Sequence, residues 1–376
     1  MTRSVRVAVV VDSDAFGGAE VWTCRVLEHL SAGIRPNLVV TEPVADRLGV
    51  PQRVERRIVV PLARHCEAAP EVAAALAQIV PDVVHVNLVD PASNRAVLDA
   101  ALSQAPTVAA LHLPGAAPDA AGLRRRYVRL AGAVAPSAPI AAQLVALGVP
   151  AHRVTRVRHG VPLPAVPVRP PGRAPLVIGG VGRLTAQKGF DLLLAAVARL
   201  HKSGRPLRVV IAGEGRDAAA LRRQAAGLPV RFLGFCPDVP ALLRRLDVFC
   251  LPSRSEALSL ALLEAVAHGL PCVTTAVGDT AGALTGAARI VPPEDLDALT
   301  AALDDLLVDA GRRRDLGDRA RQRALRDFRV ERMAAEVAAV WATVAQATAH
   351  GSAGGSARGS AGVEDGVDRG EHVGDR

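Results

Sequence analysis

Residues 176–189 read LVIGGVGRLTAQKG, and this stretch decides the fold. A short apolar run ends in a glycine-rich turn, which leads directly into the amphipathic segment 189–202. Apolar runs of this length that do not alternate with polar residues are typical of parallel strands covered on both faces. The stretch therefore predicts a strand, a tight turn and a helix, which is the repeating unit of a doubly wound α/β sheet.

The same unit recurs on both sides of a proline-rich segment, residues 161–175. Before that segment, strands are predicted at residues 5–12, 37–41, 57–62, 82–88, 107–113, 132–137 and 154–161, with helices at 19–32, 67–80, 92–104, 119–130 and 139–147. After it, strands are predicted at 176–184, 207–212, 230–235, 247–252, 271–276 and 289–291, with helices at 189–202, 217–226, 239–246, 259–268, 296–308 and 312–328. Proline-rich segments are stiff and extended, which suits a linker between two lobes. We therefore expect an α/β protein of two Rossmann-like, doubly wound parallel-sheet lobes that face each other across a cleft.

The pattern also gives domain boundaries. Residues 1–165 form the first lobe and residues 166–329 the second. A last helix, predicted over 330–347 and at most to 349, is long enough to cross back onto the first lobe. The tail, residues 350–376, is rich in glycine and serine and poor in apolar residues, so we expect it to be disordered.

Composition narrows the function classes. Half of the 376 residues are hydrophobic, and no apolar run reaches the length of a membrane-spanning helix, so we expect a cytoplasmic protein. The net charge of +8 comes from a chain that uses arginine almost exclusively, with only Lys188 and Lys202 as lysines. Aromatic residues, at 2%, are too few for base stacking, so no nucleic-acid partner is expected.

One run of basic residues could bind a further partner. Arg124, Arg125, Arg126 and Arg129 could make a weak contact with an anionic membrane surface. A solvated helix face is the commoner meaning of such a run, and no apolar aromatic edge accompanies it.

Arg183 and Lys188 are the first candidates for chemistry. Both lie in the loop that joins a predicted strand to a helix N-terminus, where backbone N–H groups and the helix dipole favour anions. A planar guanidinium and a compact ammonium at this spacing suit a diphosphate. An ordinary solvated loop is the alternative.

Two carboxylates follow in SRSEALSLALLEA, residues 253–265. Glu256 and Glu264 would lie about 12 Å apart on one continuous helix, too far to act on one bond. We therefore expect Glu256 in a loop, Ser259 as the helix N-cap, and Glu264 inside the helix, facing the cleft. There Glu264 could accept hydrogen bonds from a ribose diol; a structural ion pair is the alternative.

These motifs together resemble a family. GRLTAQKG (182–189), IAGEG (211–215), VRFLGF (230–235), the Glu256–Glu264 spacing, HGLPCVTTAVGD (268–279) and ARIVPPED (288–295) are similar in order and spacing to the retaining GT-B glycosyltransferases of the GT4-like group, glycosyltransferase group 1. FGGAE (16–20), PDVVHVN (81–87), ALHLPG (110–115) and VRHGV (157–161) extend the resemblance over about residues 5–345.

The resemblance implies a role for each matching position. Arg183 and Lys188 would bind the donor diphosphate and stabilise the leaving group, and Glu256 would contact the transferred sugar or the charge at its anomeric carbon. Glu264 would bind the ribose, and His112 would reach the sugar near the reaction centre. The remaining donor-binding positions are Gly17 and Gly18 in the first lobe, and Gly213, Phe235, Cys236, Leu258, Ser259, Leu260 and Ala261 in the second.

Some positions depart from the commoner pattern of the family. His159 stands where an asparagine is usual, Asp279 replaces a second glycine, and Gly282 replaces a frequent glutamate. Ala257-Leu258-Ser259 replaces a glycine-containing segment. Gly213, Gly215 and Ala218 also match a dinucleotide fingerprint, but they lie in the second strand–helix turn of the lobe, so a tight turn near the donor is favoured.

The sequence thus predicts transfer of a sugar from a UDP- or GDP-sugar to an acceptor hydroxyl, with retention, and with no metal or other cofactor beside the nucleotide-sugar co-substrate. A small soluble acceptor, a cyclitol or a natural-product aglycone, is favoured over a lipid-linked or polysaccharide one. A sugar-nucleotide epimerase on the same scaffold and a non-catalytic nucleotide-sugar-binding protein are the alternatives. The sequence indicates neither the sugar, the base, nor the oligomeric state.

Overall fold

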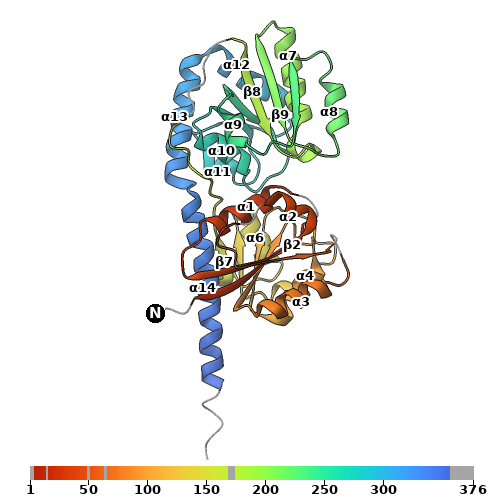
Figure 1. The fold of residues 1–376 in the computed structure, drawn as a ribbon. Helices are drawn as coiled ribbons and strands as arrows, with labels where there is room; N and C mark the ends of the chain where they lie inside the picture. The colour runs from red at the N-terminus through yellow and green to blue at the C-terminus, as the bar shows by residue number, and fades with distance from the viewer. Residues whose placement is uncertain (1–3, 14–15, 49–50, 63–65, 168–173, 356–376) are drawn as a thin grey trace, which may run out of the picture.

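The computed structural model describes residues 4–13, 16–48, 51–62, 66–167 and 174–355. They fold into two lobes, one above the other, each built on a parallel sheet with helices on both faces (Figure 1). This arrangement confirms the fold class predicted from the sequence.

The first lobe carries a seven-stranded sheet. Its strands are β1 (Val5–Val11), β2 (Ile34–Thr41), β3 (Arg56–Val60), β4 (Val83–Leu88), β5 (Thr107–Leu111), β6 (Gly132–Ala135) and β7 (Val154–Arg156). Its helices are α1 (Gly18–Glu28), α2 (Glu42–Leu48), α3 (Pro70–Ile79), α4 (Arg95–Gln104), α5 (Ala120–Tyr127), α6 (Ala138–Ala146) and the 3₁₀ turn η1 (Ala151–Arg153). The strand order is β3-β2-β1-β4-β5-β6-β7, and every pairing is parallel.

The second lobe carries a six-stranded sheet. Its strands are β8 (Leu176–Val181), β9 (Leu207–Ala212), β10 (Val230–Gly234), β11 (Val248–Leu251), β12 (Cys272–Thr275) and β13 (Arg289–Val291). Its helices are η2 (Ala186–Lys188), α7 (Phe190–Lys202), α8 (Ala218–Gln224), α9 (Val239–Leu243), α10 (Leu260–Ala267), α11 (Thr280–Leu284), α12 (Leu296–Val308) and α13 (Ala310–Asp327). The order β10-β9-β8-β11-β12-β13 is again fully parallel.

The strand order explains where a ligand can bind. In each sheet the first strand, β1 or β8, has the next strand in sequence on one side and a later strand, β4 or β11, on the other. Loops that leave this switch point diverge to opposite faces and open a crevice beyond the carboxyl ends of the strands. The residues of β1 from Val7 onward are buried, as expected for a sheet covered on both faces.

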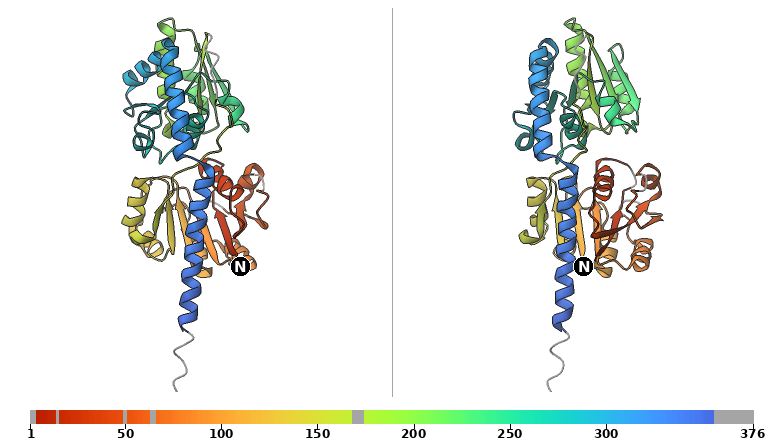
Figure 2. Two further views of the ribbon diagram at one scale, coloured as in Figure 1. Left: turned by 90° about the vertical axis from the view of Figure 1, so that its left-hand side faces the viewer. Right: turned by 60° about the vertical axis from the view of Figure 1, so that its left-hand side comes forward.

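The chain crosses between the lobes twice. Residues 157–161 leave the first lobe and run beside residues 328–330, where the Val161 N–H donates to the Phe328 carbonyl. The last helix, α14 (Val330–Gly355), then runs along the first lobe and packs on α1, β1, β4 and β6 (Figure 2). There Trp341 is buried and its indole N–H donates to Nδ1 of His85 over 3.1 Å.

Several predicted boundaries are wrong. The strand expected over 154–161 ends at Arg156, because the following residues form the crossover. Helices α2 and α11 are missing from the prediction. Helix α2 follows β2 with no connecting loop and contains Pro43, and α11 contains Gly282, a weak helix former. The last helix continues to Gly355 rather than ending near residue 349, since glycine and serine weaken a helix without stopping it. The rest of the predicted disordered tail, residues 356–376, lies outside the described residues.

We predict that Gly160→Ala destabilises the protein at the crossover. A Cβ there would lie 2.6 Å from the Arg329 carbonyl oxygen and 2.8 Å from Cα of Val330, and overpacking of this kind costs about 1–3 kcal/mol. Gly33→Ala is the matched control, because a Cβ at Gly33 meets nothing within 4 Å. Thermal unfolding measures the difference; equal midpoints for the two variants would contradict close contact between the crossovers.

Candidate functional site

The loop after β8 carries Arg183 and Lys188 to the edge of the cleft. It ends at Gly189, whose φ is +67° and whose Cβ, if present, would lie 2.0 Å from the Pro252 carbonyl oxygen. Only glycine allows this approach, which holds the loop after β8 against the loop after β11. The packing brings the Lys188 ammonium to the Glu256 carboxylate.

Glu256 lies in the loop between β11 and α10, where the sequence analysis placed it. Its Oε1 accepts hydrogen bonds from Lys188 Nζ and, over 2.9 Å, from Ser253 Oγ. The Lys188 and Glu256 side chains are 13% and 7% exposed. A charge pair this deep in a protein holds its geometry, because separating it would leave a charge without compensation.

Arg183 lies at an open part of the same loop. Its Nη2 donates to Oε1 of Gln187 over 3.2 Å, and both residues line a cavity of about 280 Å³ together with Thr185 and Arg216. Two arginine residues thus line the cavity, which favours an anionic ligand.

The glycine loop of the first lobe faces Arg183. A Cβ at Gly17 would lie 3.9 Å from Cδ of Arg183, and one at Gly18 would meet nothing within 4 Å. The Gly17 N–H donates to Oε2 of Glu20 over 2.7 Å, and burial raises the pKa of that carboxyl group. The structure therefore brings Gly17 and Arg183 together across the cleft and leaves open space over the start of α1.

The N-terminus of α10 carries the next group of predicted residues. Ser259 is the N-cap residue, in extended conformation, and its side chain makes no capping hydrogen bond. Leu258, Ser259 and Leu260 are buried, whereas Ala261 is half-buried.

Glu264, one turn into α10, makes an ion pair across the cleft. Its Oε1 accepts a hydrogen bond from Nη2 of Arg25 on α1, and the two side chains are 13% and 10% exposed. Burial lowers the pKa of Arg25 to about 10, so the guanidinium stays charged at neutral pH. Nη1 of Arg25 is buried and has no hydrogen-bond partner in the described part of the chain. The expected cleft-facing position of Glu264 is thus accompanied by a first-lobe partner that the sequence did not indicate.

His112 follows β5 directly and lies on the first-lobe side of the cleft. Its Nε2 is bonded to Oδ1 of Asn87, and its ring meets Trp22 edge-on with centroids 5.0 Å apart. Burial, with the neighbouring histidines His159 and His85 adding to it, holds the pKa of His112 well below its usual value. The imidazole is therefore neutral at physiological pH and can take part in hydrogen bonds without a charge.

His159, in the crossover, lies between the two lobes. Its Nδ1 is 2.8 Å from the carbonyl oxygen of Leu258, and its ring centroid is 6.2 Å from that of His112. Burial lowers its pKa to about 4, although the Leu258 carbonyl partly opposes the shift.

Gly213, Phe235 and Cys236 lie toward the β9–β10 side of the cleft. At Gly213 φ is +141° and a Cβ would lie 1.9 Å from the Gly182 carbonyl oxygen, so this glycine serves close backbone packing. Phe235 is 44% exposed; the Phe16 ring meets its ring edge-on, with centroids 6.4 Å apart, and the Arg47 guanidinium lies 4.9 Å from its ring centroid. Cys236 is half-buried beside it.

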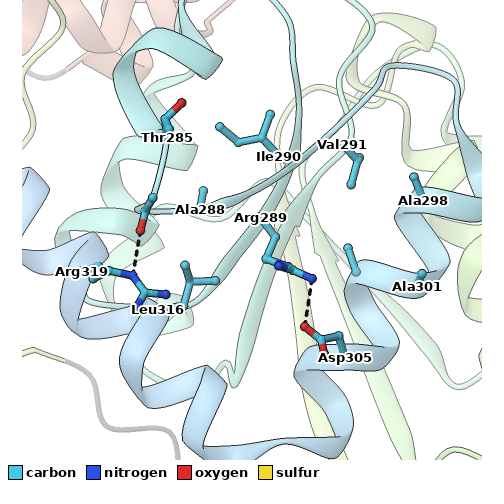
Figure 3. Close-up of a pocket in the computed structure, with 12 residues that line it drawn as sticks. Thr285, Ala288, Arg289, Ile290, Val291, Ala298, Ala301, Asp305, Leu316 and Arg319 are labelled. Atoms are coloured by element: carbon cyan, nitrogen blue, oxygen red, sulfur yellow. Dashed lines mark hydrogen bonds and ion pairs between the residues drawn. The ribbon is translucent and has the colours of Figure 1, made fainter.

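A second, larger hollow lies away from these residues. It has a volume of about 770 Å³ and lies between β13, α12 and α13, where Arg289 pairs with Asp305 and Arg319 donates to the Gly286 carbonyl (Figure 3). None of the predicted site residues lines it.

The basic run on α5 and directly after it is partly engaged within the lobe. Arg126 pairs with Asp99 at 2.6 Å, and Arg129 donates to the Leu102 carbonyl.

No helix of the described segments is long and apolar enough to cross a membrane. In the same segments, His, Cys, Asp and Glu side chains form no group of three or more that could hold a metal ion.

Sequence reasoning missed several residues that the cleft brings together. Arg25 carries no local signal, because a single arginine on a helix is ordinary; only the approach of the lobes gives it Glu264. Asp279, noted as a departure from the family, accepts hydrogen bonds from Arg156 at 3.2 Å and from the N–H of Ala138 at 3.4 Å, both in the first lobe. These contacts join the lobes on a second side of the cleft.

Comparison with known proteins agrees with this geometry. Residues 16–164 match the sequence model of Glycosyltransferase Family 4, and residues 175–309 match that of Glycosyl transferases group 1. The two matches together cover most of both lobes. The chain belongs to the group 1, family 4 glycosyltransferases, a class with the GT-B fold.

Individual relatives are similar in sequence to parts of the chain. A glycogen synthase of Mycobacterium tuberculosis is 33% identical over 198 residues, which is 50% of this chain and 48% of that protein. A 2-deoxystreptamine N-acetyl-D-glucosaminyltransferase of Streptomyces fradiae is 39% identical over 156 residues, 39% of this chain and 36% of that protein. The matches thus span about half, or less, of these relatives' own length.

Solved structures show the same fold over a greater length. Anabaena HepE, in complex with UDP and glucose, superposes with a TM-score of 0.73 at 18% identity, covering 93% of this chain and 99% of that one.

We predict that Arg25→Met loosens the contact between the lobes. The change removes the guanidinium and leaves the Glu264 carboxylate without its partner, a loss of about 3–5 kcal/mol for a buried pair. Small-angle X-ray scattering should then give a larger radius of gyration. Arg35→Met is the control, because Arg35 pairs with Glu55 within the first lobe, both exposed. A radius unchanged by Arg25→Met would show that the pair does not hold the lobes together.

Proposed function

We propose that this chain transfers a sugar from a nucleoside diphosphate sugar, with UDP or GDP as the nucleotide, to an acceptor hydroxyl with retention of anomeric configuration. The observation that carries the proposal is one arrangement at the cleft. Arg183 and Lys188 lie at the end of β8, with Glu256 bonded to Lys188 and Glu264 on the neighbouring helix. Family membership supports the reaction class, and the complex of HepE with UDP and glucose supports the kind of donor.

The difficult step is cleavage of the anomeric C–O bond, because negative charge grows on the departing diphosphate. Arg183 and Lys188, with the backbone N–H groups near the starts of α7 and α10, supply positive charge and donors for it. These groups are fixed before the reaction, so they need little reorganisation as the charge develops. Protein side chains thus supply the charge that a metal ion would otherwise provide, and we propose no other cofactor.

The two carboxylates have different neighbours and therefore different tasks. Ser253 and Lys188 hold Glu256, which can face the positive charge that develops at the anomeric carbon. We assign Glu264 to the ribose hydroxyls. Because Arg25 already donates a hydrogen bond to Glu264, the hydroxyls must bind beside Arg25 or displace its hydrogen bond. Contact between the lobes excludes water from the site, which limits hydrolysis of the donor.

For the acceptor we propose a small soluble molecule, a cyclitol or a natural-product aglycone. The relative named for 2-deoxystreptamine supports a small acceptor, whereas the glycogen synthase supports the polysaccharide alternative. A weak membrane contact through Arg124, Arg125, Arg126 and Arg129, and a cytoplasmic location, stay predictions.

A thermal-shift panel tests the donor. UDP, GDP, ADP and a nicotinamide dinucleotide would each be added with and without magnesium, and the bound nucleotide should raise the unfolding midpoint by mass action. We expect a shift with UDP or GDP that does not need magnesium. A shift with the dinucleotide alone would instead support the fingerprint at Gly213 and Gly215, and no shift with any nucleotide would contradict the proposed donor site.

We predict that Lys188→Ala still folds but loses most turnover, and that its unfolding midpoint falls because Glu256 loses its partner. Loss of one preorganised group that stabilises charge in the transition state costs about 10²–10³ in rate. The measurement is product formation at saturating donor, with circular dichroism as the check on folding. The matched control is Lys202→Ala, which removes the chain's other lysine at the exposed end of α7. Near wild-type turnover in Lys188→Ala would refute the assigned leaving-group role.

A further inference from the structure

An ion pair joins α1 of the first lobe to α10 of the second, which lies above it in Figure 1. Nη2 of Arg25 donates to Oε1 of Glu264, and the two side chains are 10% and 13% exposed. This hydrogen bond uses one nitrogen of the guanidinium and one oxygen of the carboxylate. Because a guanidinium has several N–H groups and a carboxylate has lone pairs on two oxygens, each side chain can take a further partner.

The other terminal nitrogen of Arg25 is where such a partner is needed. Nη1 is buried and makes no hydrogen bond within the described residues, and the residue as a whole is 8% exposed. A buried N–H group without an acceptor carries a free-energy cost, and the cost is greater when the group is charged. Arg25 therefore calls for an acceptor from outside the chain, a ligand or a water molecule, close to Glu264.

The face of α10 that carries Glu264 leaves room for a ligand. Within α10, Ala261 and Glu264 are half-buried and all other residues are buried. Residues three apart lie on the same face of a helix, so Ala261 and Glu264 form one partly open face. Because the side chain of Ala261 is a single methyl group, it leaves space next to the carboxylate.

Both helices carry their groups in the order in which a nucleotide carries its own. On α10, the N-terminal residues 258–261 are assigned to the donor phosphate and sugar, and Glu264 follows them. On α1, Gly18 at the N-terminus faces open space, and Arg25 follows two turns later, about 10 Å along the axis. Residues two turns apart share one face of a helix. Since the ribose of a nucleotide is joined directly to the diphosphate, Arg25 and Glu264 lie where the ribose should follow the phosphates.

A ribose is a poor replacement for either member of the ion pair. Its hydroxyl groups are neutral, so a ribose that displaced Arg25 from Glu264 would leave two opposite charges without compensation in a buried place. A hydroxyl group, however, both donates and accepts hydrogen bonds. It can donate to Glu264 and accept from Nη1 of Arg25 at the same time, which keeps the ion pair and satisfies the buried nitrogen.

We propose that Arg25 completes the ribose site from the first lobe: its Nη1 donates a hydrogen bond to a ribose hydroxyl that itself donates to Glu264. Arg25 is thus a specificity-determining residue, which selects ribonucleotides over deoxyribonucleotides. The inference rests on the proposed function, which assigns Glu264 to the ribose, and adds a partner from the opposite lobe. Binding of the nucleotide then depends on the approach of α1 to α10.

Arg25→Lys tests the second nitrogen separately from the charge. Lysine keeps a positive charge for Glu264, but its compact ammonium lacks the planar fork that reaches two acceptors side by side. Arg25→Met removes the charge as well. Arg156→Met is the matched control, because Arg156 also joins the lobes, through Asp279 at 3.2 Å instead of Glu264.

Calorimetric titration would compare UDP and GDP with their dideoxy analogues, which lack both ribose hydroxyls, on the wild type and the three variants. For the base that binds, the wild type should prefer the ribonucleotide. Arg25→Lys should weaken the ribonucleotide about tenfold, the effect of one lost hydrogen bond, and the dideoxy analogue less than about twofold. Arg25→Met should weaken the ribonucleotide at least as much, and Arg156→Met should change both ligands by the same factor. Circular dichroism checks that each variant folds.

Two results would overturn the role of Arg25. Equal losses for both ligands in Arg25→Lys, or none, would mean that Arg25 only joins the lobes and that water satisfies Nη1. Tighter binding of the ribonucleotide to either Arg25 variant would mean that the ion pair blocks the ribose. Failure of the proposed function gives a different result: the wild type would bind none of the nucleotides, or would bind the ribonucleotide and its dideoxy analogue equally.

A second measurement uses the wild-type protein. The nitrogen-15 resonances of the Arg25 guanidinium are identified by their absence from Arg25→Lys or Arg25→Met. They should move when the ribonucleotide binds and move less with the dideoxy analogue, because only the ribonucleotide brings an acceptor to Nη1. Equal movement with both bound ligands, or none, would also overturn the proposal.

Discussion

Two buried ion pairs lie where the two lobes meet, and the placement of the lobes relative to each other depends on the pair that joins them. Lys188 is bonded to Glu256 within the second lobe, and Arg25 of the first lobe is bonded to Glu264 of the second. Neither pair is freely exposed, so each charge needs its partner or a ligand that replaces it. A ligand with a diphosphate and hydroxyl groups offers an anion for Lys188 and neutral partners that fit beside Arg25 and Glu264.

The buried histidines, in contrast to these paired charges, are neutral. His85, His112 and His159 have pKa values lowered by burial, so they contribute no charge at neutral pH. Their partners fix which nitrogen carries the proton: Trp341 donates to His85, whereas Leu258 accepts from His159. The cleft thus has charged groups at the carboxyl ends of the second-lobe strands, with Arg25 as a charged partner from the first lobe, and neutral histidines in the first lobe and the crossover. This division suits a charged leaving group on one side and sugar hydroxyls on the other.

Much of the fold and part of the cleft could be predicted because their signals are local. Val-rich runs, glycine turns and amphipathic segments predicted most strands and helices. The spacing of Glu256 and Glu264 argued against one continuous helix that carries both carboxylates to the same bond. Helix α11 was missed because it contains Gly282, a weak helix former, and Arg25 was missed because its partner lies 239 residues away in sequence. The departure at Asp279 was visible in the sequence, but its contacts with Arg156 and Ala138 depend on how the lobes meet.

By itself, the sequence determined two doubly wound lobes and the residue types at the ends of their strands. It did so because hydrophobic periodicity, turn residues and loop chemistry act over a few neighbouring residues. Only the tertiary structure decided which side chains meet across the cleft. The pairing of Arg25 with Glu264 and the bond from His159 to Leu258 join segments far apart in the chain, and they arise from the packing of complete lobes about two crossovers.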